Sequence, residues 1–153
     1  MKKITSSIYS FEQLIGNDFL YVDKTEYIWK LIEAAPAMYF MSRPRRFGKS
    51  LTVSTLKELF NGRRELFRGL AIDRKKYDWE KYPVIHLDMN GWNFSTPENL
   101  LSSLCSLIQS QAAVHSVVLP ISSPEAMFRE LITKLAQQNP VVILLDEYDK
   151  PIL

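Results

Sequence analysis

The sequence predicts an α/β fold with a mostly parallel sheet and helices on both of its faces. Short apolar runs of strand type alternate along the chain with segments whose apolar residues recur at helical spacing. The last run, residues 141–145, is continuously branched or aliphatic, as in a strand buried on both faces. Apolar residues make up 46% and charged residues 24% of 153, the mixture of a single globular domain.

The first predicted helix spans residues 24–35. Asp23 and Glu26 have the spacing of a capping box, and Pro36 ends the helical pattern. The other interpretation of Asp23 is that the 21–25 segment borders an adenine ring. A short apolar run at 37–41 then predicts a buried strand.

A second helix is predicted at 49–61, with Gly62 as the glycine just past its end. Residues 83–88 predict a strand whose first position is a proline. Helices are also predicted at 97–112 and 124–138. Each begins with the same sequence pattern, a Thr or Ser cap followed by proline at the first helical position. The apolar run at 141–145 predicts the third strand.

Composition excludes several classes of protein. The 19 basic and 17 acidic residues leave a net charge of +2, which excludes a histone-like polycation. A single cysteine, Cys105, excludes a disulfide framework and a cysteine-based zinc site. Without a run of 18 apolar residues or an apolar leader, we expect a cytoplasmic protein with no membrane partner.

Charge is divided unevenly along the chain. Residues 1–80 hold 15 Lys and Arg against 10 Asp and Glu, whereas residues 81–153 hold 4 against 7. The first half is therefore expected to favour anions, and the second half to supply carboxylates; two differently solvated faces are the alternative. Acidic residues interrupt the basic residues of 63–76, which favours a solvated face there over nucleic-acid binding.

The segment between the first strand and the helix at 49 has the features of a phosphate-binding loop. Phe47, Gly48, Lys49 and Ser50 lie where a helix starts, and unpaired N–H groups and the helix dipole favour an anion there. Lysine reaches the terminal phosphates and the serine hydroxyl binds Mg²⁺ in this motif. We expect the N–H groups from Phe47 to Leu51 to hold phosphates.

The phosphate motif, which we place at residues 43–50, departs from the usual pattern. Its first glycine is replaced by Arg43, and Pro44 lacks an N–H group. Together Arg43, Arg45 and Arg46 give the loop a high positive charge, and Arg46 is counted among the nucleotide-binding residues. Such arginines add charge at the phosphates or serve a neighbouring subunit's nucleotide, or else they solubilise the loop and pair with carboxylates.

Residues 141–147 have the pattern of a Walker B segment, an apolar strand that ends in Asp146 and Glu147. An aspartate there holds Mg²⁺, and a following glutamate deprotonates the attacking water. Ser50, Asp146, phosphate oxygens and waters would give the ion the oxygen ligands it prefers. Both motifs follow strand ends, where ligands of parallel sheets bind. Asp88 ends another strand, and either lies near the magnesium or caps the following turn.

The chain resembles a known family in three segments. These are Tyr-Val-Asp-Lys-Thr at 21–25, Ser-Arg-Pro-Arg-Arg-Phe-Gly-Lys-Ser-Leu at 42–51 and Asp-Glu-Tyr-Asp-Lys-Pro at 146–151. They resemble the predicted AAA-type ATPase-like domain of bacterial and archaeal proteins, a P-loop NTPase that often carries a C-terminal PD-(D/E)XK nuclease-like domain. The resemblance covers nearly the whole chain. It implies that arginine in place of the first glycine, here Arg43, is usual in the family. It also implies that Lys49 and Ser50 contact nucleotide and magnesium, and that Asp146 and Glu147 form the Walker B pair.

The function expected from these motifs is Mg-ATP binding, with hydrolysis in the complete protein. Lys49 and Glu147 are the expected catalytic residues, Ser50 and Asp146 the metal ligands, and Mg²⁺ and ATP the cofactors. ATP rather than GTP follows from the resemblance and from the absence of an Asn-Lys-x-Asp string. The alternative is a nucleotide-gated or nucleic-acid-binding interaction module without turnover, with nucleic acid bound only through a further C-terminal domain.

The three strands also predict an incomplete sheet. Residues 1–36 are interpreted as a lead-in helix, and residues 37–153 as the core through Walker B of one ATPase-like domain. The class with a catalytic glutamate, as the resemblance implies, places a later strand between the phosphate-loop strand and the Walker B strand. We therefore expect a fragment with ATPase activity near zero. Alone, it either self-associates through exposed strand edges, closes the gap by rearranging, or holds its site misaligned.

Overall fold

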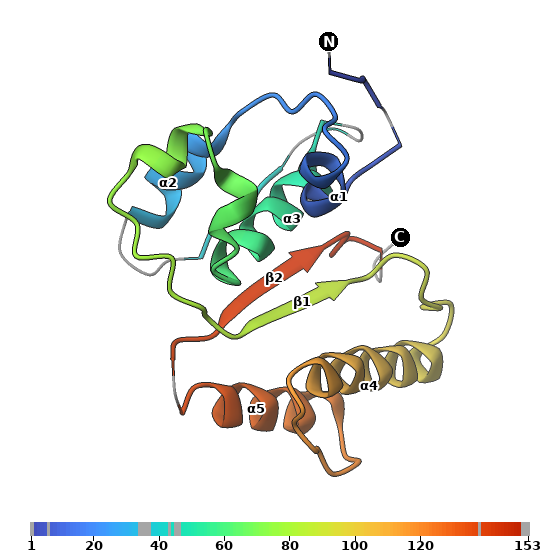
Figure 1. The fold of residues 1–153 in the computed structure, drawn as a ribbon. Coiled ribbons are helices and arrows are strands. Elements are labelled where there is room, and N and C mark those ends of the chain that lie inside the picture. Colours follow the sequence, from blue (N-terminus) through green and yellow to red (C-terminus); the bar gives the residue numbers. More distant parts are fainter. Residues whose placement is uncertain are drawn as a thin grey trace. The chain divides into compact units, whose positions relative to one another are not determined.

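The computed structural model describes residues 2–5, 7–33, 38–42, 44, 47–137 and 139–150. The chain divides into two compact units, Met1–Lys81 and Tyr82–Leu153. The first unit is helical, and the second contains a parallel sheet with two helices (Figure 1). The predicted combination of helices with a parallel sheet is present in the second unit, where the described sheet has two strands.

The first unit contains three α-helices: α1 (Phe11–Gly16), α2 (Thr25–Glu33) and α3 (Lys49–Phe60). Two 3-10 turns follow, η1 (Arg64–Phe67) and η2 (Ala71–Arg74). The predicted helices at 24–35 and 49–61 correspond to α2 and α3. Helix α1 and the two 3-10 turns were not predicted, and residues 34–37 lie outside the described part of the chain.

Aromatic rings build the core of the first unit. Phe11 and Phe67 are fully buried, with their ring centroids 4.8 Å apart. The Trp79 ring lies 5.2 Å from the Phe67 ring, in a tilted contact, and 5.2 Å from the Tyr77 ring, edge to face, so this tryptophan serves packing. Apolar side chains from α2, α3 and η2 complete the cluster. Burial of these aromatic and apolar side chains stabilises the first unit, whose helices are too short to be stable through helix propensity alone.

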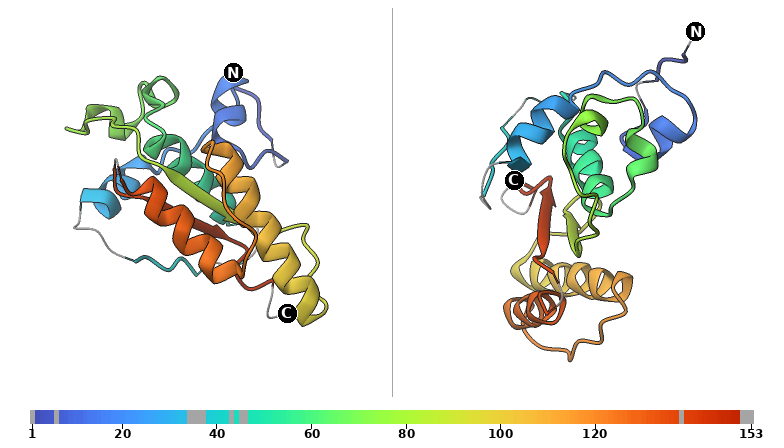
Figure 2. Two further views of the ribbon diagram at one scale, coloured as in Figure 1. Left: turned by 90° about the horizontal axis from the view of Figure 1, so that it is seen from below. Right: turned by 60° about the vertical axis from the view of Figure 1, so that its left-hand side comes forward.

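The second unit pairs β1 (Val84–Asp88) with β2 (Val142–Asp146) in parallel, in a register that runs from Val84↔Val142 to Asp88↔Asp146. Helices α4 (Pro97–Val114) and α5 (Pro124–Leu135) both lie on one face of this pair (Figures 1 and 2). The core between sheet and helices includes Ile85, Leu107 and Leu131. These elements confirm the predictions at 83–88, 97–112, 124–138 and 141–145 within a few residues.

The caps of α4 and α5 are as predicted. The Thr96 hydroxyl accepts the Asn99 N–H at 3.2 Å, and the Ser123 hydroxyl accepts the Ala126 N–H at 3.4 Å. Each satisfies one donor that a helix start leaves free, and a proline follows each cap at the first helical position. Cap chemistry therefore fixes where both helices begin.

The strand predicted at 37–41 is wrong for the residues that the structure describes. Residues 38–42 adopt an irregular conformation, and the side chains of Met38 and Phe40 are exposed. A strand is stable only when a neighbour pairs with its N–H and C=O groups. The described sheet consists of β1 and β2, so residues 38–41 of the apolar run lack the pairing that would make them a strand.

Candidate nucleotide-binding site

The structure places the two halves of the predicted site in different units, and each half is described within its own unit. The phosphate-loop half lies at the start of α3, and the Walker B half lies at the end of β2. Both placements agree with the sequence prediction that one motif opens a helix and the other ends a strand.

Gly48 forms the junction between the loop and α3. Its φ of 78° and ψ of 23° lie in the left-handed region, which glycine adopts without the cost that a side chain would impose. A Cβ at this position would meet no atom within 4 Å, so backbone conformation rather than space favours glycine. The Gly48 carbonyl accepts both the N–H and the hydroxyl of Thr52, each at 2.9 Å, and so closes the first turn.

The start of α3 has no side-chain cap, whereas Ser10, Thr96 and Ser123 cap α1, α4 and α5. The first N–H groups of a helix have no partner inside the helix, and the helix dipole makes their surroundings positive. An anion with several acceptor oxygens suits such a helix start. The described loop therefore has the chemistry expected of a phosphate site.

The predicted loop residues divide by exposure. Phe47 is 63% exposed, and Lys49 and Ser50 are half-buried. The side chain of Leu51 packs against the core of the first unit, so only its backbone is free to serve a ligand. Arg43, Arg45 and Arg46 lie outside the described residues.

The Walker B half ends in a tight turn. Asp146 is 7% exposed, and its Oδ1 atom accepts the N–H of Glu147 at 3.0 Å. Glu147 has a φ of 52°, an uncommon left-handed conformation for a residue with a side chain. Its carbonyl accepts the Lys150 N–H at 3.0 Å. Left-handed side-chain residues often occur at functional sites, where the surrounding structure holds them in place.

Asp88 lies beside Asp146 in the register of the sheet. Its Oδ1 atom accepts the N–H of Asn90 at 2.9 Å, at the start of a turn in which Gly91 has a φ of 80°. Asp88 thus caps this turn, one of the two roles that the sequence left open.

Asp23 accepts a hydrogen bond at the start of α2, as a cap does, and also makes a distant contact that the sequence did not predict. Its Oδ1 atom accepts the N–H of Thr25 at 2.8 Å and the Thr25 hydroxyl at 2.7 Å, while Oδ2 accepts the Ala71 N–H at 2.7 Å. Glu26 bonds Lys75 at 3.0 Å, so the predicted capping box of Asp23 with Glu26 is wrong. Burial raises the pKa of Asp23, but the hydrogen bonds from Thr25 and Ala71 outweigh it, and the net pKa is lowered. The Asp-x-Thr spacing was the only signal in the sequence for this arrangement.

Carboxylates neutralise much of the basic stretch at 63–76. Arg63 pairs with Glu12 at 3.0 Å and also with Glu65, and Arg64 pairs with Asp73 at 3.3 Å. These pairs support the solvated face that the alternating charges indicated.

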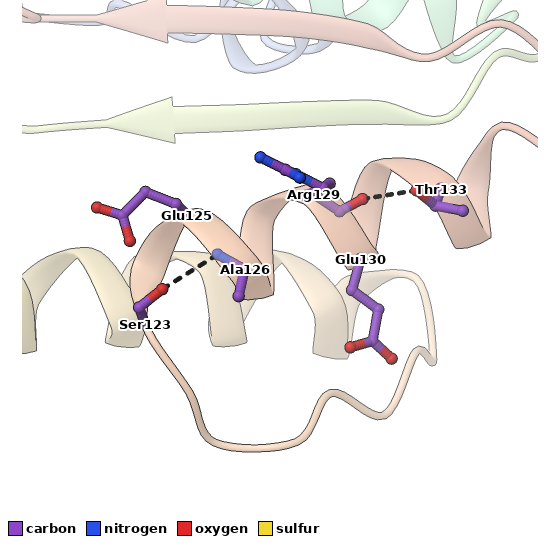
Figure 3. Close-up of a pocket in the computed structure, with 6 residues that line it drawn as sticks. All are labelled: Ser123, Glu125, Ala126, Arg129, Glu130 and Thr133. Atoms are coloured by element: carbon purple, nitrogen blue, oxygen red, sulfur yellow. Dashed lines mark hydrogen bonds between the residues drawn. The ribbon is translucent and has the colours of Figure 1, made fainter.

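A shallow depression runs along α5 (Figure 3). It is lined by Ser123, Glu125, Ala126, Arg129, Glu130 and Thr133. The Ser123 hydroxyl caps the helix, and the Thr133 hydroxyl donates to the Arg129 carbonyl at 2.9 Å. Because the helix itself uses these hydroxyls, the depression carries no functional assignment.

The described part of the chain has neither a membrane-spanning helix nor a cluster of metal-binding side chains. No helix there has the length and apolar character needed to cross a membrane. No three His, Cys, Asp or Glu side chains gather there in a metal-binding group. The predicted magnesium site does not require such a group, because it draws on one carboxylate, one hydroxyl, phosphate oxygens and water.

A family described as "Predicted AAA-ATPase" matches residues 5–153. The chain belongs to the predicted AAA-ATPase family. This AAA-ATPase-like chain is also 39% identical, over 156 residues, to a protein of Azotobacter chroococcum mcd 1 described as "Uncharacterized protein in vnfD 5'region". The match covers 99% of the chain and 30% of that relative, so the chain spans about a third of the relative's length. No solved structure matches the chain.

Proposed function

We propose that this AAA-ATPase-like chain binds Mg-ATP as part of a P-loop NTPase core, and that the whole protein hydrolyses it. The observation that carries the proposal is the start of α3. There Gly48 is left-handed, no side chain caps the helix, and Lys49 and Ser50 follow at once. Membership of the family supports nucleotide binding in general.

Each residue has a role in this proposal. The N–H groups from Phe47 to Leu51 bind the phosphates, with Lys49 adding a positive charge at the terminal ones and stabilising charge that develops there. Arg46 is proposed to add to this charge. A hydroxyl at Ser50 and the carboxylate of Asp146 are the oxygen donors that would hold Mg²⁺, which neutralises phosphate charge when bound.

Glu147 is proposed as the general base for hydrolysis. Its backbone N–H is engaged by Asp146, and the turn closed by Lys150 holds its backbone at the end of β2. Its carboxylate would accept a proton from the attacking water, which otherwise is a weak nucleophile at neutral pH. Glu147→Gln in the full-length protein should retain ATP binding and hydrolyse ATP at least ~10²-fold more slowly.

Lys49→Ala tests nucleotide binding, and Lys57→Ala on the last turn of the same helix is the matched control. At a hundredfold excess over its dissociation constant, Mg-ATP should stabilise the parent by about 2.7 kcal/mol, which thermal unfolding detects as a shift of roughly 5–10 °C. Lys49→Ala should lose this shift and Lys57→Ala should keep it. Equal shifts in all three proteins would remove Lys49 from the phosphates.

A second pair of variants tests the metal role. Asp146→Asn should weaken the dependence of ATP binding on Mg²⁺, whereas Asp88→Asn, which changes the neighbouring carboxylate, should not. Salt-dependent binding of DNA with no stabilisation by ATP, ADP or GTP would instead favour an interaction module without turnover.

A further inference from the structure

Two adjacent hydroxyls hold the second turn of α3. The Ser54 hydroxyl accepts the N–H of Phe11, the first residue of α1, at 2.9 Å. The Thr55 hydroxyl donates to the Leu51 carbonyl at 2.7 Å, and Thr55 is 1% exposed. Ser54 thus connects α3 to another helix, and Thr55 binds the backbone of the turn that follows Gly48.

The residue on the other side of the Ser54 contact is buried among aromatic rings. Phe11 is fully buried, with its ring 4.8 Å from Phe67 and 5.1 Å, edge to face, from Tyr21. Its N–H belongs to the first turn of α1 and has no partner within that helix. Ser54 satisfies this donor, so α1 and α3 are joined at one point that lies one helical turn beyond Ser50.

Tyr21 makes a third contact with the same turn. Its ring packs against Phe11, and its hydroxyl interacts with the Thr55 side chain. Burial raises the pKa of Tyr21, with the contact to Thr55 acting in the opposite direction. Aromatic packing and hydroxyl contacts therefore meet on one side of α3, close to the proposed phosphate loop.

We propose that Ser54 and Thr55 are positioning residues, which hold the first turn of α3 in the orientation that lets its N–H groups and Lys49 meet the phosphates. The inference rests on the proposed function. Neither side chain is proposed to touch the nucleotide. When an anchor is lost, the competent orientation is populated less, and the apparent affinity falls by the same factor. One hydrogen bond of ordinary strength shifts such an equilibrium by about 5-fold.

The test compares Ser54→Ala and Thr55→Val with the conservative variants Ser54→Thr and Thr55→Ser. Thr133→Val is the control, because the Thr133 hydroxyl makes the same kind of bond to a carbonyl four residues back on α5. Calorimetry with Mg-ATP well below the unfolding temperature gives the dissociation constants, and thermal unfolding without nucleotide gives the stability. Ser54→Ala and Thr55→Val should each bind about 5-fold more weakly, while the conservative variants and Thr133→Val bind as the parent does.

The outcomes separate the inference from the function on which it rests. If Ser54→Ala and Thr55→Val lose thermal stability but bind Mg-ATP like the parent, their role is structural and the inference is wrong. If the parent binds no nucleotide, or Lys49→Ala binds equally well, the proposed function fails and the inference falls with it. If Ser54→Ala does not fold, the comparison of the isosteric Thr55→Val with Thr55→Ser tests the inference. Weaker binding of Mg-ATP by Thr55→Val but not by Thr55→Ser supports it, and equal binding by both contradicts it.

Discussion

Replacing Asp23 with alanine should destabilise the first unit. The carboxylate accepts three hydrogen bonds at 2.7–2.8 Å, two from Thr25 and one from Ala71, which lies 48 residues away. Thr25 is itself fully buried, and its hydroxyl accepts the Ile72 N–H at 3.1 Å. The variant therefore loosens the connection between α2 and η2 as well as the start of α2.

The expected magnitude follows from these contacts. A hydrogen bond to a charged acceptor contributes about 1.5–3 kcal/mol, and loss of a helix cap costs about 0.5–2 kcal/mol. Because the Asp23 side chain is exposed, water replaces part of what is lost, and the values do not add. We expect Asp23→Ala to lower the free energy of unfolding by about 2 kcal/mol, or the melting temperature by roughly 4–8 °C.

The pH dependence of this effect has a definite sign. The folded pKa of Asp23 is lowered, so its stabilisation is complete above the unfolded pKa of about 3.9 and is lost as the pH falls through the folded pKa. Thermal unfolding at pH 7, 5 and 3 measures this. The difference between parent and Asp23→Ala should be equal at pH 7 and 5 and smaller at pH 3.

Asp78→Ala is the control for Asp23→Ala, because the Asp78 carboxylate accepts the N–H of Glu80 only two residues ahead, at 3.1 Å. It should change the melting temperature by no more than 1–2 °C, on the scale of about 0.5 kcal/mol for a surface substitution. A loss in Asp23→Ala no larger than in Asp78→Ala, or one that persists unchanged at pH 3, would refute the reasoning.

Three further predictions concern stability and association. In urea unfolding, Gly62→Ala should lower the free energy of unfolding by at least ~1 kcal/mol more than Gly69→Ala does. Both glycines have positive φ, but a Cβ at Gly62 would lie 2.8 Å from the Trp79 carbonyl oxygen, whereas a Cβ at Gly69 would meet no atom within 4 Å. Ser123→Ala should cost about 1 kcal/mol through loss of the α5 cap; an unchanged unfolding midpoint would contradict that role. Leu145 on β2 is 49% exposed, so Leu145→Lys should reduce the self-association that light scattering measures. Val118→Lys, which changes an exposed residue in a loop, should not reduce it. Equal effects of the two substitutions would argue against association through β2.

Local signals predicted most of the second unit. The Thr-Pro and Ser-Pro pairs at 96–97 and 123–124 mark the starts of α4 and α5 because cap and first helical residue act on neighbouring backbone groups. The same kind of signal placed the start of α3 at Gly48 and the end of β2 at Asp146. Contacts between residues far apart in the sequence gave no such signal. The hydrogen bond from the Ala71 N–H to Asp23 and the one from the Phe11 N–H to Ser54 could not be predicted from the sequence.

The two apolar runs at 37–41 and 141–145 show why one strand prediction was confirmed and the other was not. Both are short and apolar, so composition cannot separate them. The second run lies in a segment that also supplies a partner strand and the covering helices, and Val142 donates its N–H to the Pro83 carbonyl at 2.9 Å. The first run lies between α2 and α3. The apolar side chains of these two helices pack into the aromatic core of the first unit. A strand therefore forms where the chain provides both a backbone partner and an apolar cover, and the run itself specifies neither.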